Sequence, residues 1–474
     1  MKSQEQLIHE ATLRILARTG MRFEHPKAIE VLKANGIDVD EEGIARFTEE
    51  QIMYWVSKAP HAFTLFARNP KYNLYIGGDV MNLAPGYGCP FIVEPDGSKR
   101  KPTIDDFAKF AKLYHQQESF HCNGGIIVQP EDMPIDNATL LMFYLTYLIS
   151  DKALLTGTAD SAQVEAMMQM AEAAFGGPEE FRKYPRLITL INTVTPLQLT
   201  NVMTESLFQF VEHGQPVIIG SLGQAGSTSP VTLAGSMALS NAEILAGIAL
   251  VQMINPGNPV VYGVETTTAD MKSGATAIGA PEGAICYEFA GRMAEFYGIP
   301  CRAGGCLSDA KKVDAQAGME SMITFMACRK GNVNFMIHAA GIMDAYASMS
   351  YEKLIVDFQV IDFVNRYHRW FDINEDTLPE DLIDEVGQDG VYLTEDHTFE
   401  FCRVEPLTPE ISVRGSVLDP GTQFERNIQA KIDKELARYE RPALDPAVIE
   451  KMHEILKGRG VTDELIAKLE DYSK

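Results

Sequence analysis

The sequence predicts an α/β protein built around a (β/α)8 TIM barrel, and three observations support this fold class. Apolar strand patterns alternate with helical patterns along most of the chain, in about eight pairs spaced roughly 30–45 residues apart. The strand patterns are continuous apolar runs, which is typical of parallel strands that are covered on both faces. The predicted helices end at Gly and Pro signals that lead straight into the next run, as at residues 213–216 and 255–257.

A doubly wound, dinucleotide-binding sheet is the alternative fold. Such a sheet needs Gly-x-Gly-x-x-Gly at the start of its first helix, with an acidic residue about 20 positions later. The nearest phrase, at residues 220–226, has glycines in a different register and lies in the middle of the chain. We interpret it as a strand-to-helix loop and favour the barrel.

Residues 1–78 are predicted to form an N-terminal extension, with helices over 7–19, 25–36 and 48–59, followed by short β-rich runs. The barrel is predicted over 79–370 and a charged helical extension, suited to packing or assembly, over 371–474. The predicted barrel strands lie within 80–85 or 90–95, then 119–128, 152–160, 186–196, 216–223, 259–265, 300–309 and 334–341. The predicted helices lie within 104–116, 137–150, 161–175, 200–214, 230–254, 281–298, 314–331 and 350–367.

Composition excludes several classes of partner. The 474-residue chain has a net charge of −24 and a pI near 4.8, which argues against binding nucleic acid or an anionic membrane. The N-terminus lacks a signal-peptide pattern, and no apolar run suggests a membrane span. Seven scattered cysteines without a Cys-x-x-Cys pair favour a reduced, cytoplasmic setting.

The motifs of several catalytic classes are missing. The sequence contains no His-x-His or His-Glu-x-x-His pattern and no His/Cys cluster with zinc spacing, so we expect no metal site. It also lacks a Gly-x-Ser-x-Gly nucleophile elbow. The predicted strands end mostly in Gly, Thr, Asn and Ser, and few acid–base groups converge there. The residues at these strand ends indicate a site that positions a substrate, while another molecule supplies the reactive group.

Three long motifs carry a family resemblance. Residues 230–263, 303–321 and 337–362 resemble the trimethylamine methyltransferase superfamily, in the same order and at compatible spacing, and residues 86–114 match more loosely. The resemblance implies a (β/α)8 barrel that moves a methyl group from an amine to a cobalt corrinoid on a separate protein. Founding members carry pyrrolysine, whereas this chain has only standard residues. Similar members without pyrrolysine act on quaternary amines such as betaines.

This chemistry is consistent with a site that has few acid–base groups. A quaternary ammonium leaves as a neutral amine once a methyl group is removed, so no general acid is needed. The resemblance implies that the Co(I) corrinoid of the partner supplies the nucleophile and that this chain binds no cofactor tightly. The helical ends of the chain suit a homodimer or a larger ring, so we expect a homo-oligomer. The barrel would align the methyl group and exclude water. A non-catalytic binder of quaternary ammonium is the alternative function, and a zinc-dependent barrel enzyme is a third possibility. The choice among glycine betaine, proline betaine, carnitine and γ-butyrobetaine stays open.

The candidate site residues follow from strand ends and from the resemblance. His338 is predicted to hydrogen-bond the substrate carboxylate or the corrinoid, Asn192 to bind or orient a carboxylate, and Glu265 to offset the cation. Aromatic faces bind quaternary ammonium groups, although ordinary core packing is the competing interpretation for each ring. The predicted substrate-binding residues are Tyr87, Phe91, Tyr262, Tyr346 and Phe358, with Arg302 as a carboxylate partner. The predicted corrinoid-facing residues are Gly304 and Gly305 as a shelf, with Ser308, Asp309, Lys311 and Gly341. Lys311 and Asp309 could instead form a salt bridge at the rim.

Overall fold

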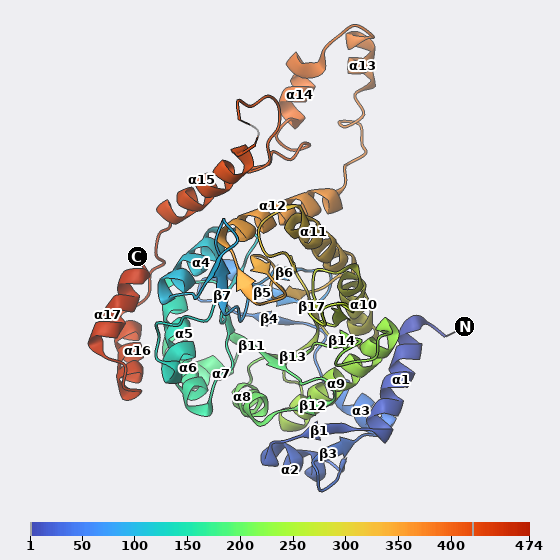
Figure 1. Ribbon diagram of the computed structural model, residues 1–474, viewed down its shortest axis with the longest axis vertical. Coiled ribbons are helices and arrows are strands. Elements are labelled where there is room, and N and C mark those ends of the chain that lie inside the picture. The colour runs from blue at the N-terminus through green and yellow to red at the C-terminus, as the bar shows by residue number, and fades with distance from the viewer. Residues whose placement is uncertain (1, 420) are drawn as a thin grey trace.

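Eight parallel strands form a barrel in the computed structural model, which describes residues 2–419 and 421–474 (Figure 1). They follow one another around the ring in chain order, so each strand–helix unit lies beside the next. The predicted fold class is confirmed. The barrel strands are β6 (Asn82–Leu83), β9 (Cys122–Gly124), β10 (Ala153–Thr156), β11 (Leu187–Asn192), β13 (Val217–Ser221), β15 (Val260–Val264), β18 (Cys301–Ala303) and β19 (Phe335–Met336).

The first barrel strand lies in the 80–85 run rather than the 90–95 run. The latter forms β7 (Phe91–Val93), which belongs to a separate four-stranded sheet above the barrel, in the order β20-β21-β7-β8. The loops after β6 and β9 complete the ring, because Gly88 N–H donates to the Ile126 carbonyl at 2.5 Å. The other members of that sheet are β8 (Lys99–Arg100), β20 (Ile342–Met343) and β21 (Ser348–Met349).

A helix follows each barrel strand and covers its outer face. Several helices begin with a side-chain cap: Asp160 and Asp314, for example, each accept two backbone N–H groups of the first turn. These helices are α4 (Ile104–Gln116), α5 (Ala138–Ile149), α6 (Ser161–Ala174), α8 (Asn201–Glu212), α9 (Leu233–Ile254), α10 (Pro281–Tyr297), α11 (Ala315–Lys330) and α12 (Tyr351–Arg369). Short elements in the connecting loops are α7 (Pro178–Arg182), β14 (Gln224–Ala225), β16 (Thr267–Ala269), β17 (Thr276–Ala277) and the 3-10 turn Ile135–Asn137.

Helix α9 is long and apolar enough to cross a membrane by length and composition alone, in contrast to the expectation from the sequence. In the structure 89% of its apolar window is buried inside the protein. It packs against β13 and β15 on one side and the N-terminal helices on the other. Its all-round hydrophobicity therefore reflects burial on every face within the fold.

The N-terminal segment packs onto the barrel. Strand β1 (Met21–Phe23) pairs in parallel with β12 (Gln198–Leu199), which lies in the loop after β11. Helices α1 (Gln4–Arg18) and α3 (Glu49–Val56) pack along α9. The hairpin of β4 (Phe63–Leu65) and β5 (Leu74–Ile76) adds its apolar side chains to the barrel interior. The remaining elements here are α2 (Pro26–Ala34), β2 (Asp38–Val39), β3 (Ile44–Arg46) and the turn Pro70–Tyr72.

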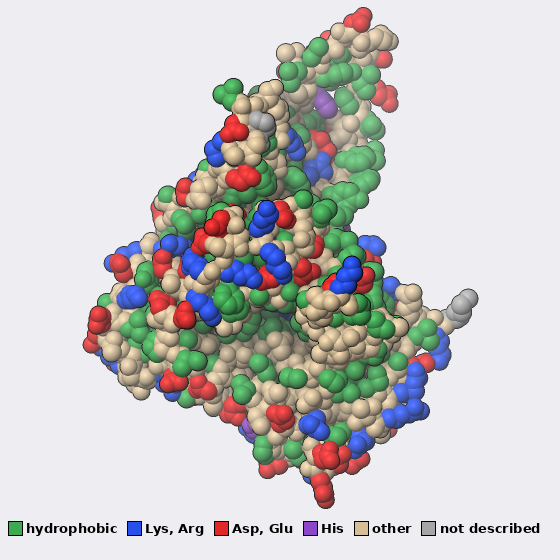
Figure 2. All heavy atoms as spheres, viewed as in Figure 1, with side chains coloured by type: hydrophobic (Ala, Val, Ile, Leu, Met, Phe, Trp, Pro, Cys, Tyr) green, Lys and Arg blue, Asp and Glu red, His purple; other side chains and the backbone are tan. Residues whose placement is uncertain are grey.

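The C-terminal segment has two parts. Residues 370–419, which we call the arm, leave the end of α12 and project away from the barrel (Figures 1 and 2). The remainder returns along the outside, with α15 on α4 and α12, α16 on α6, and α17 on α5. The arm contains α13 (Glu380–Val386), the turn Tyr392–Thr394 and α14 (Asp396–Phe401), and the rest contains α15 (Gln423–Ala437), α16 (Pro446–Gly458) and α17 (Asp463–Tyr472).

Candidate functional site

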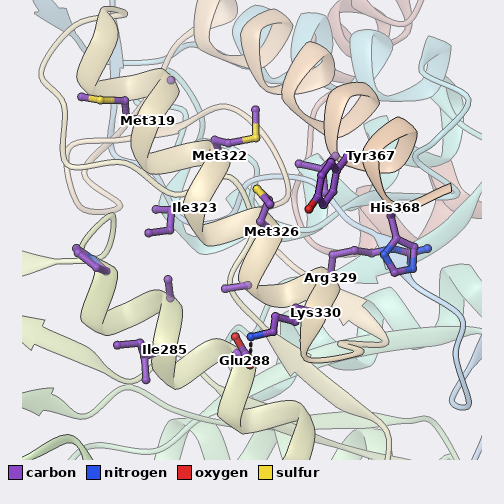
Figure 3. Close-up of a pocket in the computed structure, with 15 residues that line it drawn as sticks. Ile285, Glu288, Met319, Met322, Ile323, Met326, Arg329, Lys330, Tyr367 and His368 are labelled. Atoms are coloured by element: carbon purple, nitrogen blue, oxygen red, sulfur yellow. Dashed lines mark ion pairs between the residues drawn. The ribbon is translucent and has the colours of Figure 1, made fainter. Parts of the chain in front are cut away.

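A cavity of about 360 Å³ lies at the carboxyl ends of the barrel strands, where this fold builds its active sites. A larger groove of about 1080 Å³ runs over the outer faces of α10, α11 and α12 and contains none of the strand-end residues (Figure 3). The position of the smaller cavity makes it the candidate site. Its lining residues are Tyr87, Gly88, Leu190, Asn192, Thr193, Leu222, Glu265, Arg302, His338 and Tyr346.

A buried ion pair lies in the wall of this cavity. Arg302 Nη1 is 2.9 Å from Glu265 Oε1, and the two side chains are 1% and 6% exposed. Glu265 directly follows β15, and Arg302 lies at the centre of β18, next to β15 in the ring. Burial raises the pKa of Glu265, while Arg302 and the Tyr346 hydroxyl oppose that rise. The pair therefore brings a negative and a positive charge into a space that water barely reaches.

One edge of the Arg302 guanidinium has no partner. Its Nε and Nη2 atoms are buried and make no hydrogen bond to any described residue, whereas Nη1 faces Glu265. Nε and Nη2 form the fork with which arginine binds a carboxylate through two parallel hydrogen bonds. Buried donors without a partner are rare in native proteins, so this edge indicates a ligand with an anionic group.

Aromatic rings line the cavity near the ion pair. The Tyr346 hydroxyl donates to Glu265 Oε2. The Tyr346 ring lies 4.8 Å from the His338 ring, and the Tyr87 ring meets His338 edge-on at 6.3 Å, both between centroids. Burial raises the pKa of Tyr87 to about 12, so its ring stays neutral and electron-rich at physiological pH. These rings provide the surface that a quaternary ammonium group prefers.

His338 occupies a constrained position after β19. Its φ is +66°, in the left-handed region, and its N–H donates to the Pro85 carbonyl at 3.0 Å. Burial, together with the nearby charge of Arg302, holds its pKa well below the usual value. The imidazole is therefore neutral, and its Nδ1 has no hydrogen-bond partner among the described residues. A neutral imidazole with a free nitrogen can donate or accept one hydrogen bond to a ligand.

The state of His338 predicts a loss of stability in mild acid. Below its unfolded pKa of 6.5 the unfolded chain takes up a proton that folded His338 refuses, so the free energy of unfolding falls as pH falls. The contribution near pH 5.5 is about 1 kcal/mol. Urea titrations at pH 7.5 and 5.5 should show a smaller loss for His338→Gln than for the natural chain. Equal losses would show that His338 takes up its proton as readily when folded.

Tyr346 lies in a strained turn that two lysines hold. Asp344, Ala345 and Tyr346 have φ values of +53°, +50° and +68°, which non-glycine residues rarely adopt in succession. Lys99 and Lys311 both form ion pairs with Asp344. Lys311 thus pairs with Asp344 and not with Asp309. The turn brings the Tyr346 hydroxyl to Glu265, which indicates that the backbone strain serves the site.

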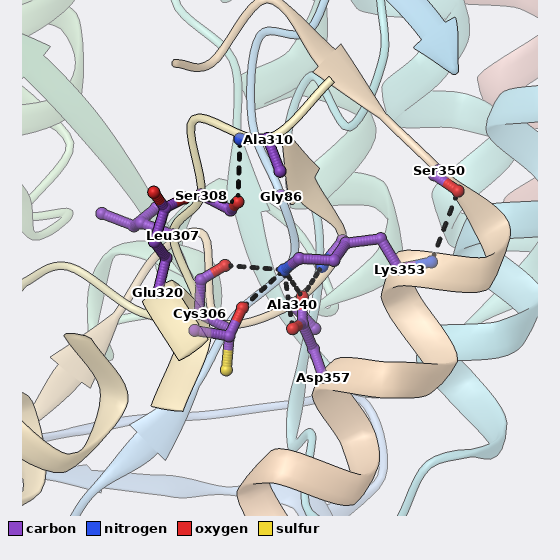
Figure 4. Close-up of polar contacts among 12 residues, drawn as sticks. Gly86, Cys306, Leu307, Ser308, Ala310, Glu320, Ala340, Ser350, Lys353 and Asp357 are labelled. Carbon is purple, nitrogen blue, oxygen red and sulfur yellow. Dashed lines mark hydrogen bonds and ion pairs between the residues drawn. The ribbon is translucent and has the colours of Figure 1, made fainter. Parts of the chain in front are cut away.

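A second buried ion pair supports two loops behind the cavity (Figure 4). Lys353 Nζ donates to both oxygens of Asp357 at 2.7 and 2.6 Å, to Ser321 at 2.7 Å and to the Cys306 carbonyl at 3.3 Å. Asp357 also accepts the Gly341 N–H at 2.7 Å. These contacts fix the loops after β18 and β19 relative to α12.

Glu243 is a positioning residue that the sequence analysis missed. It lies on α9 and is fully buried without a cation; its carboxylate accepts from Thr193 at 2.5 Å, Ser221 at 2.7 Å and the Leu197 N–H at 2.6 Å. It therefore anchors the loops after β11 and β13, on the Asn192 side of the cavity. The signal that could have revealed it is that Glu243 is the single acidic residue within the apolar run 233–254.

The structure brings together some predicted residues and separates others. Six of them line the cavity: Tyr87, Asn192, Glu265, Arg302, His338 and Tyr346. Three predicted aromatic residues do not. Tyr262 points out of the barrel and its hydroxyl donates to Asn241 at 2.8 Å; Phe358 packs against Phe120 at 5.4 Å; the Phe91 ring lies under Lys101 at 4.6 Å.

The predicted corrinoid-facing residues do not line the cavity either. Gly304 and Gly305 are buried, and a Cβ on Gly305 would lie 2.2 Å from the His338 carbonyl oxygen, so protein fills the space of the predicted shelf. Ser308 donates to Glu320 at 2.7 Å, and Asp309 accepts the N–H groups of Ile278 and Gly279 at 3.0 and 3.1 Å. Burial, reinforced by Glu320, raises the pKa of Asp309 to about 6. Gly341 donates its N–H to the buried Asp357 carboxylate.

Comparison with known proteins establishes the family. The family model for trimethylamine methyltransferase matches residues 1–461. The chain belongs to this family. Within it, the chain is 40% identical to a glycine betaine methyltransferase of Desulfitobacterium hafniense, over 97% of this chain and 96% of the other. It is 30% identical to a proline betaine:corrinoid methyltransferase of Eubacterium limosum, over 93% of both chains.

A further family member is more distant. The trimethylamine methyltransferase MttB of Desulfitobacterium hafniense is 28% identical, over 85% of this chain and 82% of the other.

Among the described residues, no group of three or more His, Cys, Asp or Glu side chains lies together in a way that could hold a metal ion. The residues that line the candidate site include the ion pair, the two tyrosine rings and His338.

Proposed function

We propose that this chain removes a methyl group from a betaine, a quaternary amine that also carries a carboxylate, and passes it to the corrinoid of a separate protein. The observation that carries the proposal is the unpartnered edge of Arg302 beside an aromatic wall. A betaine offers a carboxylate to the first and a trimethylammonium group to the second. The betaine methyltransferases among the relatives support this substrate class.

The residues of the cavity have separate roles in this proposal. Arg302 Nε and Nη2 bind the substrate carboxylate, and His338 Nδ1 is available for a further hydrogen bond. The faces of Tyr87 and Tyr346 bind the ammonium group, each contributing about 0.5–2 kcal/mol. Glu265 offsets the cationic charge of Arg302, so the empty cavity carries little net charge. Asn192, braced through the loop that Glu243 anchors, limits how the substrate can turn.

No residue has to act as an acid or a base. The leaving amine is neutral, so the carbon–nitrogen bond breaks without proton transfer. The acceptor supplies the nucleophile when the partner protein presents it. This chain contributes alignment of one methyl group with the cavity mouth and exclusion of water.

Most of the residues that were predicted to face the corrinoid contact other parts of this chain. Gly304, Gly305, Ser308 and Gly341 are buried and engaged with the protein, and only Lys311 has a largely exposed side chain, at 68%. We therefore assign no corrinoid contact to them and treat the corrinoid as a methyl acceptor held by its carrier. We also place the protein in the cytoplasm, where seven unpaired cysteines are stable.

A substrate screen tests the proposal. The purified chain is mixed with a reduced corrinoid protein and one amine at a time, and loss of the Co(I) absorption is followed. We expect at least one of glycine betaine, proline betaine, carnitine and γ-butyrobetaine to react. Choline keeps the quaternary nitrogen but lacks the carboxylate, and trimethylamine lacks both the carboxylate and the quaternary nitrogen, so neither should react. The proposal would be overturned if trimethylamine reacted while none of the betaines did. It would also be overturned if a betaine lost its methyl group with no corrinoid carrier present.

A further inference from the structure

The groove on the outside of the barrel is an exposed apolar surface. Figure 3 shows methionine side chains of α11 between Ile285 of α10 and Tyr367 at the end of α12. Ile285, Met319 and Tyr367 are 59%, 67% and 65% exposed. A groove of about 1080 Å³ with so much apolar surface is unusual on a free monomer and typical of a protein interface. We call it the α10–α11 groove.

The arm is a second exposed apolar surface in the same chain. It projects from the barrel, and apolar side chains are visible along it (Figure 2). Leu393 and Phe399 are 79% and 77% exposed, and none of the arm's helices contributes a buried residue. Most apolar side chains of the arm therefore gain little from the fold of their own chain, although Ile411, near the return to α12, is buried in the core. The other exposed apolar residues of the arm are Trp370, Phe371, Ile373, Leu378, Ile383, Val391, Tyr392, Val404, Val413 and Leu418.

Contacts at the base hold the arm away from its own groove. Arg366, in the last part of α12, donates from Nη2 to the Glu405 carbonyl at 2.7 Å and forms an ion pair with its carboxylate at 2.8 Å. Arg369 donates to the Val404 carbonyl at 2.7 Å. Both ends of the segment 370–405 are therefore fixed at one point on α12. The arm is an outward excursion and does not lie over the α10–α11 groove of the same chain.

The two surfaces are complementary in charge. Residues 371–405 contain twelve acidic residues and one basic residue, Arg403. The groove is lined by Arg329, Lys330 and His368, with Glu288 as its acidic member, and Glu288 is already paired with Lys330 at 2.9 Å. Arg329 Nε is buried and has no partner among the described residues. The arm is acidic and apolar, and the groove is basic and apolar, so the two surfaces match in charge and in hydrophobicity.

We propose that the arm of one chain occupies the α10–α11 groove of a second copy. The arm begins immediately after Tyr367 and His368, which line the groove, so a two-fold axis near this point would place each arm on the other chain's groove. Such an exchange is self-complementary and closes at two chains. It covers both exposed apolar surfaces at once. The inference is independent of the proposed methyl transfer.

Light scattering after size exclusion tests the stoichiometry. The natural chain should run at twice its mass of 52.4 kDa. Met319→Asp in the groove and Phe399→Asp in the arm should each shift it to the monomer, because each places a charge in the apolar contact. Val202→Asp on α8 is the matched control, since Val202 is 58% exposed on another face. All three positions are exposed, so each variant should keep its fold, which an unchanged far-ultraviolet circular dichroism spectrum checks.

Crosslinking between two differently tagged chains tests the contact itself. Cys402 lies next to the end of α14 in the arm and is exposed, while the other six cysteines are buried. A bismaleimide should join Cys402 of one chain to a second chain that carries Met319→Cys and Cys402→Ser. The same second chain with Val202→Cys in place of Met319→Cys is the control. A monomeric natural chain, a dimer that survives both Asp variants, or crosslinking that does not exceed the control would each overturn the proposal.

Discussion

Arg302→Leu is expected to lower the free energy of unfolding by about 3–5 kcal/mol, because it leaves Glu265 as a buried carboxylate without a cation. The same change removes both donors that we assign to the substrate carboxylate. Charge-assisted hydrogen bonds of this kind contribute about 1.5–3 kcal/mol each, so kcat/KM for the betaine should fall at least about 100-fold. Chemical denaturation and the cobalt assay measure the two effects separately.

The double variant Glu265→Leu with Arg302→Leu separates stability from function. Replacing both partners of a buried pair by apolar residues is often neutral, so the double variant should recover most of the lost stability while methyl transfer stays absent. Lys183→Met, which breaks an exposed pair with Glu180, is the control and should cost less than about 1 kcal/mol. An active Arg302→Leu variant would contradict the role assigned to this arginine.

Gly305→Ala is expected to lower methyl transfer about 100-fold or more. The added Cβ would lie 2.2 Å from the carbonyl oxygen of His338 and 2.6 Å from its carbonyl carbon, both of them backbone atoms. The loop after β19 has to move, and displacement of a site residue by about 1 Å costs roughly 100-fold in rate. Overpacking of this kind also destabilises by about 1–3 kcal/mol. Cobalt assays and thermal melts measure both changes.

Stability measurements on Gly305→Ala distinguish packing against His338 from a role of Gly305 as a shelf for the corrinoid. A shelf residue would lose activity without loss of stability, whereas packing against His338 predicts that both fall together. Gly458→Ala is the control, because a Cβ at that helix end meets no atom within 4 Å. It should melt at or above the temperature of the natural chain and keep full activity. Full activity of Gly305→Ala would show that the loop yields without disturbing His338.

Much of the site could be predicted because barrel strands place their ends on one face. His338 and Arg302 were predicted with the help of the family resemblance and Asn192 from its place at a strand end, and all three line one cavity. Tyr262 and Glu265 lie in the same apolar run, three positions apart. Neighbouring strand residues face opposite sides, so an odd separation sends one side chain out and the other in. The structure turns Glu265 inward and Tyr262 toward α9.

The contacts between loops could not be predicted in the same way. Lys311 and Asp344 are far apart in sequence, as are Glu243 and Thr193, and no local pattern indicates that they meet. Likewise, the N-terminal sheet gains β12 from a loop of the barrel. These pairings depend on how loops from different strand–helix units converge at one end of the ring.

The sequence by itself determined the barrel, the family and which residues stand at the strand ends, because these follow from local periodicity and long motifs. Only the tertiary structure decided which of those side chains enter the cavity. The physical reason is that a strand buried on both faces is apolar on both, so its pattern carries no mark of inside and outside. Ring closure and the packing of helices against one face supply that distinction.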